Sequence, residues 1–210
     1  MFRDHQPKIA AHASTPQGLF DVQMLAILSA HMPFRRVGED FAAVRSGDTT
    51  PLFAWKHEAW RQAKDQMETR HRALKNTWEN AQVGEEMRDA RMLTCVASWF
   101  GLGFVKGGFV LQMAYGISGC IDARNIDTFG VNPRSVSAPK KMEQYKTRYR
   151  KALAYNKLIR SLGGTENLWN AWCTYYAESG DYPEWVDGWQ VSAEHCRILG
   201  LDPGSPIEED

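Results

Sequence analysis

The sequence predicts an all-α protein built as a single domain. Apolar residues recur every three or four positions in several segments, which is the spacing of one face of a helix. No segment alternates apolar and polar residues as a half-buried strand does. With 43% hydrophobic and 11% aromatic residues among 210, the chain can bury a substantial core.

The N-terminal half is expected to hold a flexible arm and two helices. Residues 1–16 have no apolar core and are predicted to be the arm, and the domain is expected to span residues 17–200. The segment GLFDVQMLAILSAHMPF predicts a helix that Pro33 ends. From residue 53 to about 82 the chain is charge-rich and has neither Gly nor Pro, which predicts one long helix with a thin apolar stripe.

The C-terminal half is expected to hold five helices. Residues 85–99 and 107–115 predict two helices joined by a glycine-rich turn. Ser137-Ala138-Pro139 predicts the cap of a helix that reaches Leu162, where two glycines stop it. Two further helices are expected to begin at Thr165 and Pro183, and residues 201–210 are expected to be an acidic tail.

The composition limits the classes of function. Lys and Arg total 25, as do Asp and Glu, so the net charge identifies no partner. Residues 134–160, however, hold nine Lys or Arg against Glu143 alone, which predicts either an anion-binding face or a solvated helix face. The four cysteines form no CxxC pair, so neither a metal nor a cofactor is expected. Without a signal segment or a long apolar run, the chain is expected in the cytoplasm and away from membranes.

The stretch FGLGFVKGGFVLQMAYGISGCIDARN, residues 100–125, carries the main functional signal. Its glycines permit positive φ in a tight turn and the close approach of another backbone. The first N–H groups of the second helix, together with the Lys106 ammonium, can bind a phosphate. The stretch therefore predicts a helix-hairpin-helix that grips double-stranded DNA without reading its sequence, through Gly101, Gly103, Lys106, Gly107 and Gly108.

The segments GFVKGGF and CID, with the apolar helix between them, resemble the hairpin and downstream aspartate of the helix-hairpin-helix (HhH-GPD) DNA glycosylase superfamily, of the endonuclease III type. LAILSAH, residues 25–31, is similar to a further helix of that family. The resemblance covers roughly residues 20–130 and implies a helical bundle with a central helix-hairpin-helix. It also implies that Asp122 is the catalytic carboxylate and that His31 lies near the pocket for a flipped base.

The sequence also departs from the glycosylase pattern. Val105 or Lys106 replaces the second hairpin glycine, the family's nucleophilic lysine falls on Gly107, and the iron–sulfur cysteines are absent. The amino-acid sequence of this stretch resembles a phage branch of the superfamily, the glutamyl/putrescinyl-thymine pyrophosphorylases, more than it resembles endonuclease III. That similarity implies an enzyme of the host cytoplasm that joins an amine to pyrophosphorylated hydroxymethyluracil in DNA.

Each candidate residue also has a structural interpretation. Asp122 is either a base beside a flipped nucleotide or the N-cap of the helix that follows it. Lys106 is a phosphate contact, a nucleophile or a solvated turn residue. Trp172 and its neighbouring aromatics are core residues or a stacking platform. The remaining candidates contact DNA or form ordinary loop and surface: His31, Arg124, Asn125, Lys140 and Lys141.

Three functions are consistent with these residues. The first is a transferase that modifies a flipped pyrimidine in double-stranded DNA, with Asp122 as its base. The second is a DNA N-glycosylase. The third is a non-catalytic DNA-binding or structural protein with the same fold, which the neutral charge and the altered hairpin favour.

Overall fold

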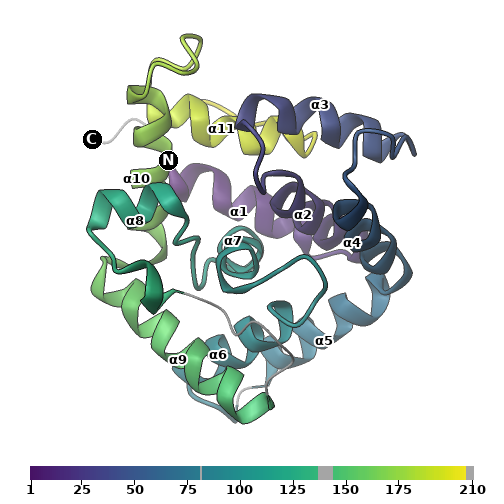
Figure 1. Cartoon of the computed structure of the whole chain (residues 1–210), viewed down its shortest axis with the longest axis vertical. Helices are drawn as coiled ribbons and strands as arrows, with labels where there is room; N and C mark the ends of the chain where they lie inside the picture. Colours follow the sequence, from purple (N-terminus) through teal and green to yellow (C-terminus); the bar gives the residue numbers. More distant parts are fainter. Residues whose placement is uncertain (81, 137–143, 207–210) are drawn as a thin grey trace.

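In a computed structural model of the chain, which describes residues 1–80, 82–136 and 144–206, all regular elements are helical (Figure 1). The predicted all-α class is confirmed. In chain order, the helices are α1 (Phe2–Ala13), α2 (Pro16–Leu28), α3 (Phe34–Arg45), α4 (Ala54–Asp65), α5 (Met67–Glu79), α6 (Glu85–Val96), α7 (Phe104–Tyr115), α8 (Ala123–Phe129), the short 3-10 helix η1 (Pro133–Ser135), α9 (Tyr145–Ser161), α10 (Gly164–Glu178) and α11 (Gly188–Ile198).

Helix α7 lies at the centre of the molecule. Figure 1 shows it end-on, and α1, α2 and α6 pack directly against it. It has no polar face, and nine of its twelve residues are buried, as expected for a helix that is apolar all round. The close approach of another backbone requires a glycine here, because a Cβ on Gly108 would lie 2.1 Å from the Gly119 carbonyl oxygen.

The C-terminal helices complete the wall around α7. Helix α9 packs on α6, and α10 packs on α8, α9 and α11. Tyr155 of α9 is buried and ties its helix to the loop after α7, since its hydroxyl donates to the Gly119 carbonyl and accepts from the Ile121 N–H. These two hydrogen bonds hold the loop that leads to Asp122 at Gly119 and at Ile121.

The N-terminus differs from the predicted flexible arm. Residues 2–13 form α1, which packs against α7 and buries His5, Ile9 and Ala13. Its buried positions recur at helical spacing, but one of them is a histidine and Pro7 lies inside the helix, so the sequence shows no continuous apolar stripe. The arm is therefore a structural helix of the domain.

Two further differences concern residues 34–79. Residues 34–45, which the sequence analysis leaves unassigned, form α3, with Pro33 as its N-cap residue. The single long helix expected from residue 53 to about 82 is instead α4 and α5, which separate at Gln66. Both α4 and α5 pack on α2, and the change of direction lets each of them bury its thin apolar stripe there.

The C-terminal segments agree with the prediction in part. Helix α9 begins at Tyr145, while the predicted cap Ser137-Ala138-Pro139 lies outside the described residues. Helix α11 begins after Asp187, which caps it, and not at Pro183. The start of the expected tail is held to α1, because Lys8 donates to the Pro203 carbonyl. Within the described ranges, no helix combines the length and apolarity needed to span a bilayer.

Candidate functional site

A pocket of about 980 Å³ opens beside the N-terminal end of α7. Four segments and one residue of α4, Trp55, contribute to its lining. The segments are residues 29–36 between α2 and α3, residues 101–112, residues 120–125 around the start of α8, and residues 168–182. Its volume lies near the upper end of the range usual for small-molecule sites. The pocket is therefore large enough for a nucleotide.

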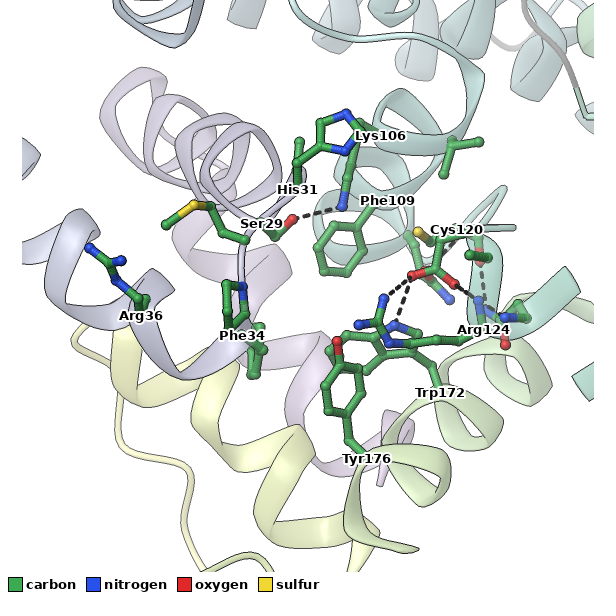
Figure 2. Close-up of a pocket in the computed structure, with 18 of the residues that line it drawn as sticks. Ser29, His31, Phe34, Arg36, Lys106, Phe109, Cys120, Arg124, Trp172 and Tyr176 are labelled. Carbon is green, nitrogen blue, oxygen red and sulfur yellow. Dashed lines mark hydrogen bonds and ion pairs between the residues drawn. The ribbon is translucent and has the colours of Figure 1, made fainter. Parts of the chain in front are cut away.

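Aromatic rings form much of the pocket wall. Figure 2 shows Phe34, Phe109, Trp172 and Tyr176 around one space. Trp172 meets Phe34 edge-on, with ring centroids 5.2 Å apart, and lies 4.4 Å from Tyr176. His195 is fully buried behind these rings, 4.8 Å from Phe34. The wall offers rigid apolar faces on which a planar ligand can stack.

Asp122 lies in the pocket and also begins α8. Its Oδ1 accepts hydrogen bonds from the backbone N–H groups of Arg124 and Asn125, both at 3.2 Å, so the N-cap interpretation is confirmed. Its Oδ2 accepts from the Trp172 indole N–H at 3.0 Å and lies 3.7 Å from the Arg124 guanidinium. Four groups therefore fix the carboxylate, which remains 15% exposed toward the pocket.

Lys106 lies in the first turn of α7 and faces the pocket. Its Nζ donates to the Ser29 hydroxyl at 2.8 Å and lies 5.6 Å from the centre of the Phe109 ring (Figure 2). Among the described residues, no carboxylate lies within 4 Å of this ammonium. Lys106 is therefore a half-buried cation that has no counter-ion in the part of the chain that the structure describes, and it is not the exposed tip of the turn.

The charges that line the pocket are mostly positive. Arg35, Arg36, Lys106 and Arg124 are lining cations, whereas Asp122 and Asp181 are the lining carboxylates. Arg124 already pairs with Asp122 and lies over the Tyr176 ring at 4.5 Å. The excess positive charge favours a ligand that carries an anionic group.

Burial changes the pKa of several groups at or near the pocket. Burial and the nearby Asp122 charge raise the pKa of the Cys120 thiol to about 12, and burial raises the pKa of the Tyr176 hydroxyl above its usual value. Neither group is an anion at neutral pH. Behind Ser29, burial lowers the pKa of Lys56 to about 8, and its Nζ donates to the Leu28 carbonyl at 2.8 Å.

The pocket brings together several of the predicted site residues. Asp122, Lys106, Arg124, Asn125 and Gly101 line it, and so does His31, which is exposed and has a positive φ of 57°. The Asn125 side chain has a structural task, since its Nδ2 donates to the Cys120 carbonyl at 2.7 Å.

The other predicted residues do not line the pocket. Gly103 is the N-cap residue of α7. Gly107 and Gly108 are buried against Ala97 and Gly119, so close helix packing accounts for these two glycines. Lys140 and Lys141 lie outside the described residues.

Sequence reasoning missed part of the pocket. Ser29 was not recognised as the partner of Lys106, and Phe34, Arg35 and Arg36 were not recognised as lining residues. For the last three the sequence carried a signal, since Phe34 begins an apolar stripe at helical spacing in the segment that became α3. The hydrogen bond between Trp172 and Asp122 joins residues 50 positions apart and had no local signal.

The described residues contain no group of three or more His, Cys, Asp or Glu side chains that could hold a metal ion. The side chains of the pocket offer one fixed carboxylate, a set of stacking faces and one ammonium that has no carboxylate within 4 Å among the described residues. A comparison of the chain with protein families, with curated proteins and with solved structures found no match.

Proposed function

We propose that this chain is an enzyme that modifies a pyrimidine flipped out of double-stranded DNA, with Asp122 as its general base. The observation that carries the proposal is the pocket in which aromatic faces, a fixed carboxylate and an excess of cations meet. A flipped base is read in such a pocket by stacking and by polar groups at its edges. The cations suit the phosphates on either side of that base.

The order of elements supports a helix-hairpin-helix bundle of the glycosylase type. Helices α6 and α7 follow one another in the chain and pack together. The turn between them includes Gly101 at a φ of 82°. Asp122 follows α7 and caps the next helix. This is the order that the resemblance implies for the hairpin and its aspartate.

The reaction we propose is the transfer of an amine to a pyrophosphorylated hydroxymethyluracil in DNA. The amine nitrogen attacks the methylene carbon on the pyrimidine ring, and a C–N bond forms. The C–O bond to pyrophosphate breaks, and pyrophosphate leaves with the electron pair. Asp122 takes the proton that the nitrogen loses, and Lys106 neutralises charge on the leaving group.

A second candidate function is a DNA N-glycosylase. The observation that favours it is the direction of Lys106, whose amine faces the pocket and lies against Phe109. A lysine nucleophile needs such a position, because it must reach the sugar carbon of the flipped nucleotide.

The two reactions are distinguished by their products. The protein is incubated with duplex DNA that contains one pyrophosphorylated hydroxymethyluracil and with a primary amine, and the nucleosides are then analysed by mass spectrometry. The transferase is expected to yield a nucleoside whose mass includes the amine, while a glycosylase releases the free base. If neither product forms, the enzymatic proposals are wrong and the non-catalytic DNA-binding function remains.

The variant Asp122→Asn tests the role of the carboxylate. The amide is isosteric, but it is a far weaker base, so product formation should fall by at least about 100-fold, the usual contribution of general base catalysis. Asp122 also caps α8, so the thermal midpoint must be measured in parallel. Asp127→Asn, on an exposed residue of the same helix, is the matched control and should retain parental activity.

DNA binding itself is tested by its dependence on salt. Lys106→Glu should weaken binding to all DNA sequences alike and reduce the slope of log affinity against log salt by about one. Lys75→Glu, at an exposed position of α5, makes the same change of net charge outside the pocket and is the control. Equal effects of the two substitutions would mean that Lys106 makes no specific phosphate contact.

A further inference from the structure

Helix α9 carries a dense group of positive charges. Its 17 residues include six Lys or Arg and no Asp or Glu. Three of these cations, Lys146, Arg150 and Lys157, are exposed, and their spacing of four and seven residues places them on one face of the helix. In the part of the chain that the structure describes, none of the three lies within 4 Å of a carboxylate. Like charges four positions apart repel each other, so an anionic partner would stabilise this face.

Two tyrosine rings are stacked at the N-terminal end of the same helix. Tyr145 is 62% exposed, and its ring is nearly parallel to that of Tyr149, with 12° between the planes and 6.1 Å between the centroids. Tyr149 is half-buried and packs against the hydrophobic core, so it anchors the pair to the domain. Tyr145 therefore presents an apolar ring to solvent, next in sequence to the exposed Lys146.

The helix that carries these groups is fixed in the domain. Helix α9 packs on α6 and α10, and it buries Ala152, Tyr155 and Ile159 on its inner side. Figure 1 shows α9 at the edge of the molecule, and none of the described residues of α9 lines the pocket. The 11 positions from Lys146 to Lys157 correspond to about 16 Å along the helix axis. The cations and the tyrosine pair thus form a preformed surface that is separate from the proposed active site.

We propose that the outer face of α9 binds single-stranded nucleic acid, with phosphates at Lys146, Arg150 and Lys157 and a base stacked on Tyr145. Proteins that bind single strands combine positive charges along the backbone with aromatic side chains on which the bases stack. The tyrosines favour a single strand over a duplex, because a duplex holds the faces of its bases inside its own stack. The proposal does not depend on the reaction in the pocket.

The stacked tyrosine is tested with a labelled oligothymidylate of about 12 nucleotides, a length within the usual range of site sizes. By fluorescence anisotropy, Tyr145→Ala should bind this strand about five-fold or more weakly, as expected for the loss of one stacked base. Tyr145→Phe keeps the ring and should bind within about two-fold of the parent. Tyr175→Ala removes a tyrosine of α10 that is 42% exposed, and this control should bind as the parent does.

The cations are tested by the dependence of the same binding on salt. The variant with Lys146→Gln and Arg150→Gln removes two charges, so the slope of log affinity against log salt should become shallower by about 1.4, or about 0.7 for each phosphate contact of a single strand. Arg72→Gln with Lys75→Gln makes the same change of net charge at exposed positions of α5 and should keep the parental slope. Thermal midpoints near the parental value exclude unfolding as the cause of a defect.

The outcomes separate this surface from other binding sites. If Tyr145→Ala and the double glutamine variant of α9 both bind the strand as the parent does, the outer face of α9 is solvated surface and the proposal is wrong. If Lys106→Glu alone weakens this binding, the strand lies at the pocket and the proposal is again wrong. A parent that binds phosphatidylserine vesicles but no oligonucleotide would assign the face to a membrane and overturn the proposal.

Two further measurements complete the test. An oligouridylate of the same length distinguishes RNA from DNA, and binding of either strand that requires Tyr145 supports the proposal. The α9 variants should carry out the proposed transfer reaction at the parental rate, since their substitutions lie outside the pocket. Failure of the α9 proposal therefore leaves the proposed function as it is, and absence of the transfer product leaves the α9 proposal as it is.

Discussion

At the scale of single residues, the packing of α7 depends on Gly108, because the site has no room for a Cβ atom. A Cβ at this position would lie 2.1 Å from the Gly119 carbonyl oxygen and 3.0 Å from its carbon. Both atoms belong to the backbone of the loop that leads to Asp122, and Tyr155 already holds this loop. We expect Gly108→Ala to destabilise the protein by about 3 kcal/mol or more, the upper end for overpacked sites, as measured by chemical denaturation.

Gly38→Ala is the control for this substitution. Gly38 lies inside α3, and the nearest atom to an added Cβ is Ile198 Cγ1 at an ordinary 3.5 Å. The same change should stabilise the protein here by about 0.5–1 kcal/mol, because alanine loses less backbone entropy in a helix. A destabilisation of similar size at both positions would contradict the steric explanation for Gly108.

The roles of individual residues could be predicted only where local chemistry decides them. For Asp122 the sequence left two roles open, a catalytic base and an N-cap. The N-cap role is confirmed, because an aspartate before a helix accepts the free N–H groups of its first turn, and the catalytic role stays a prediction. Gly107 and Gly108 were assigned to DNA contact, but the structure gives them neighbours that the sequence cannot show. A buried glycine and a phosphate-binding glycine look the same in a sequence.

Among the elements, most of the longer helices were predicted, whereas α1 and α3 were not. Helices α2, α6, α7 and α10 appear close to where the periodicity puts them. The break between α4 and α5 at Gln66 has no Gly or Pro to mark it, since it follows from packing both helices on α2. Helix α1 contributes few apolar residues, and its burial depends on α7, a partner about 100 positions away.

Ile9 tests whether α1 is part of the core. This side chain is fully buried, so Ile9→Ala should cost about 2–5 kcal/mol, whereas a residue of a flexible arm would cost nothing. Arg3→Ala on the same helix is the control, because Arg3 is 81% exposed and its ion pair with Glu166 is at the surface. Urea denaturation of both variants should show a lowered midpoint for Ile9→Ala alone.

At the scale of the whole molecule, the pocket results from packing that no single segment encodes. It is assembled from residues 29–36, Trp55, and residues 101–112, 120–125 and 168–182. Hydrogen-bonded pairs among them lie up to 147 positions apart, as when the Arg35 backbone N–H donates to the Tyr182 hydroxyl. The family resemblance indicated three of these segments, through residues 25–31, 103–109 and 120–122. The aromatic wall from α10 became part of the site only because α10 packs on α8.

Two buried histidines link the stability of the whole molecule to pH. His5 and His195 are fully buried, and within the described structure neither Nε2 atom has a hydrogen-bond partner. Burial lowers the pKa of His5 to about 4 and that of His195 to about 3. Each ring is therefore neutral in the folded protein at a pH where it takes up a proton in the unfolded chain.

The sign of the resulting pH dependence follows from these proton affinities. Above pH 6.5 both histidines are neutral in both states and contribute no pH dependence. Below pH 6.5 the unfolded chain binds more protons, so the free energy of unfolding should fall by about 1.4 kcal/mol per pH unit for each histidine until the folded pKa is reached. Urea denaturation between pH 7 and pH 5 should give this decline.

The variant His195→Phe should reduce the slope of the free energy of unfolding against pH by about half, whatever the effect of the substitution on stability at pH 7. His57→Gln, at an exposed position, should keep the parental slope. A parental slope in His195→Phe would mean that another group carries the acid sensitivity.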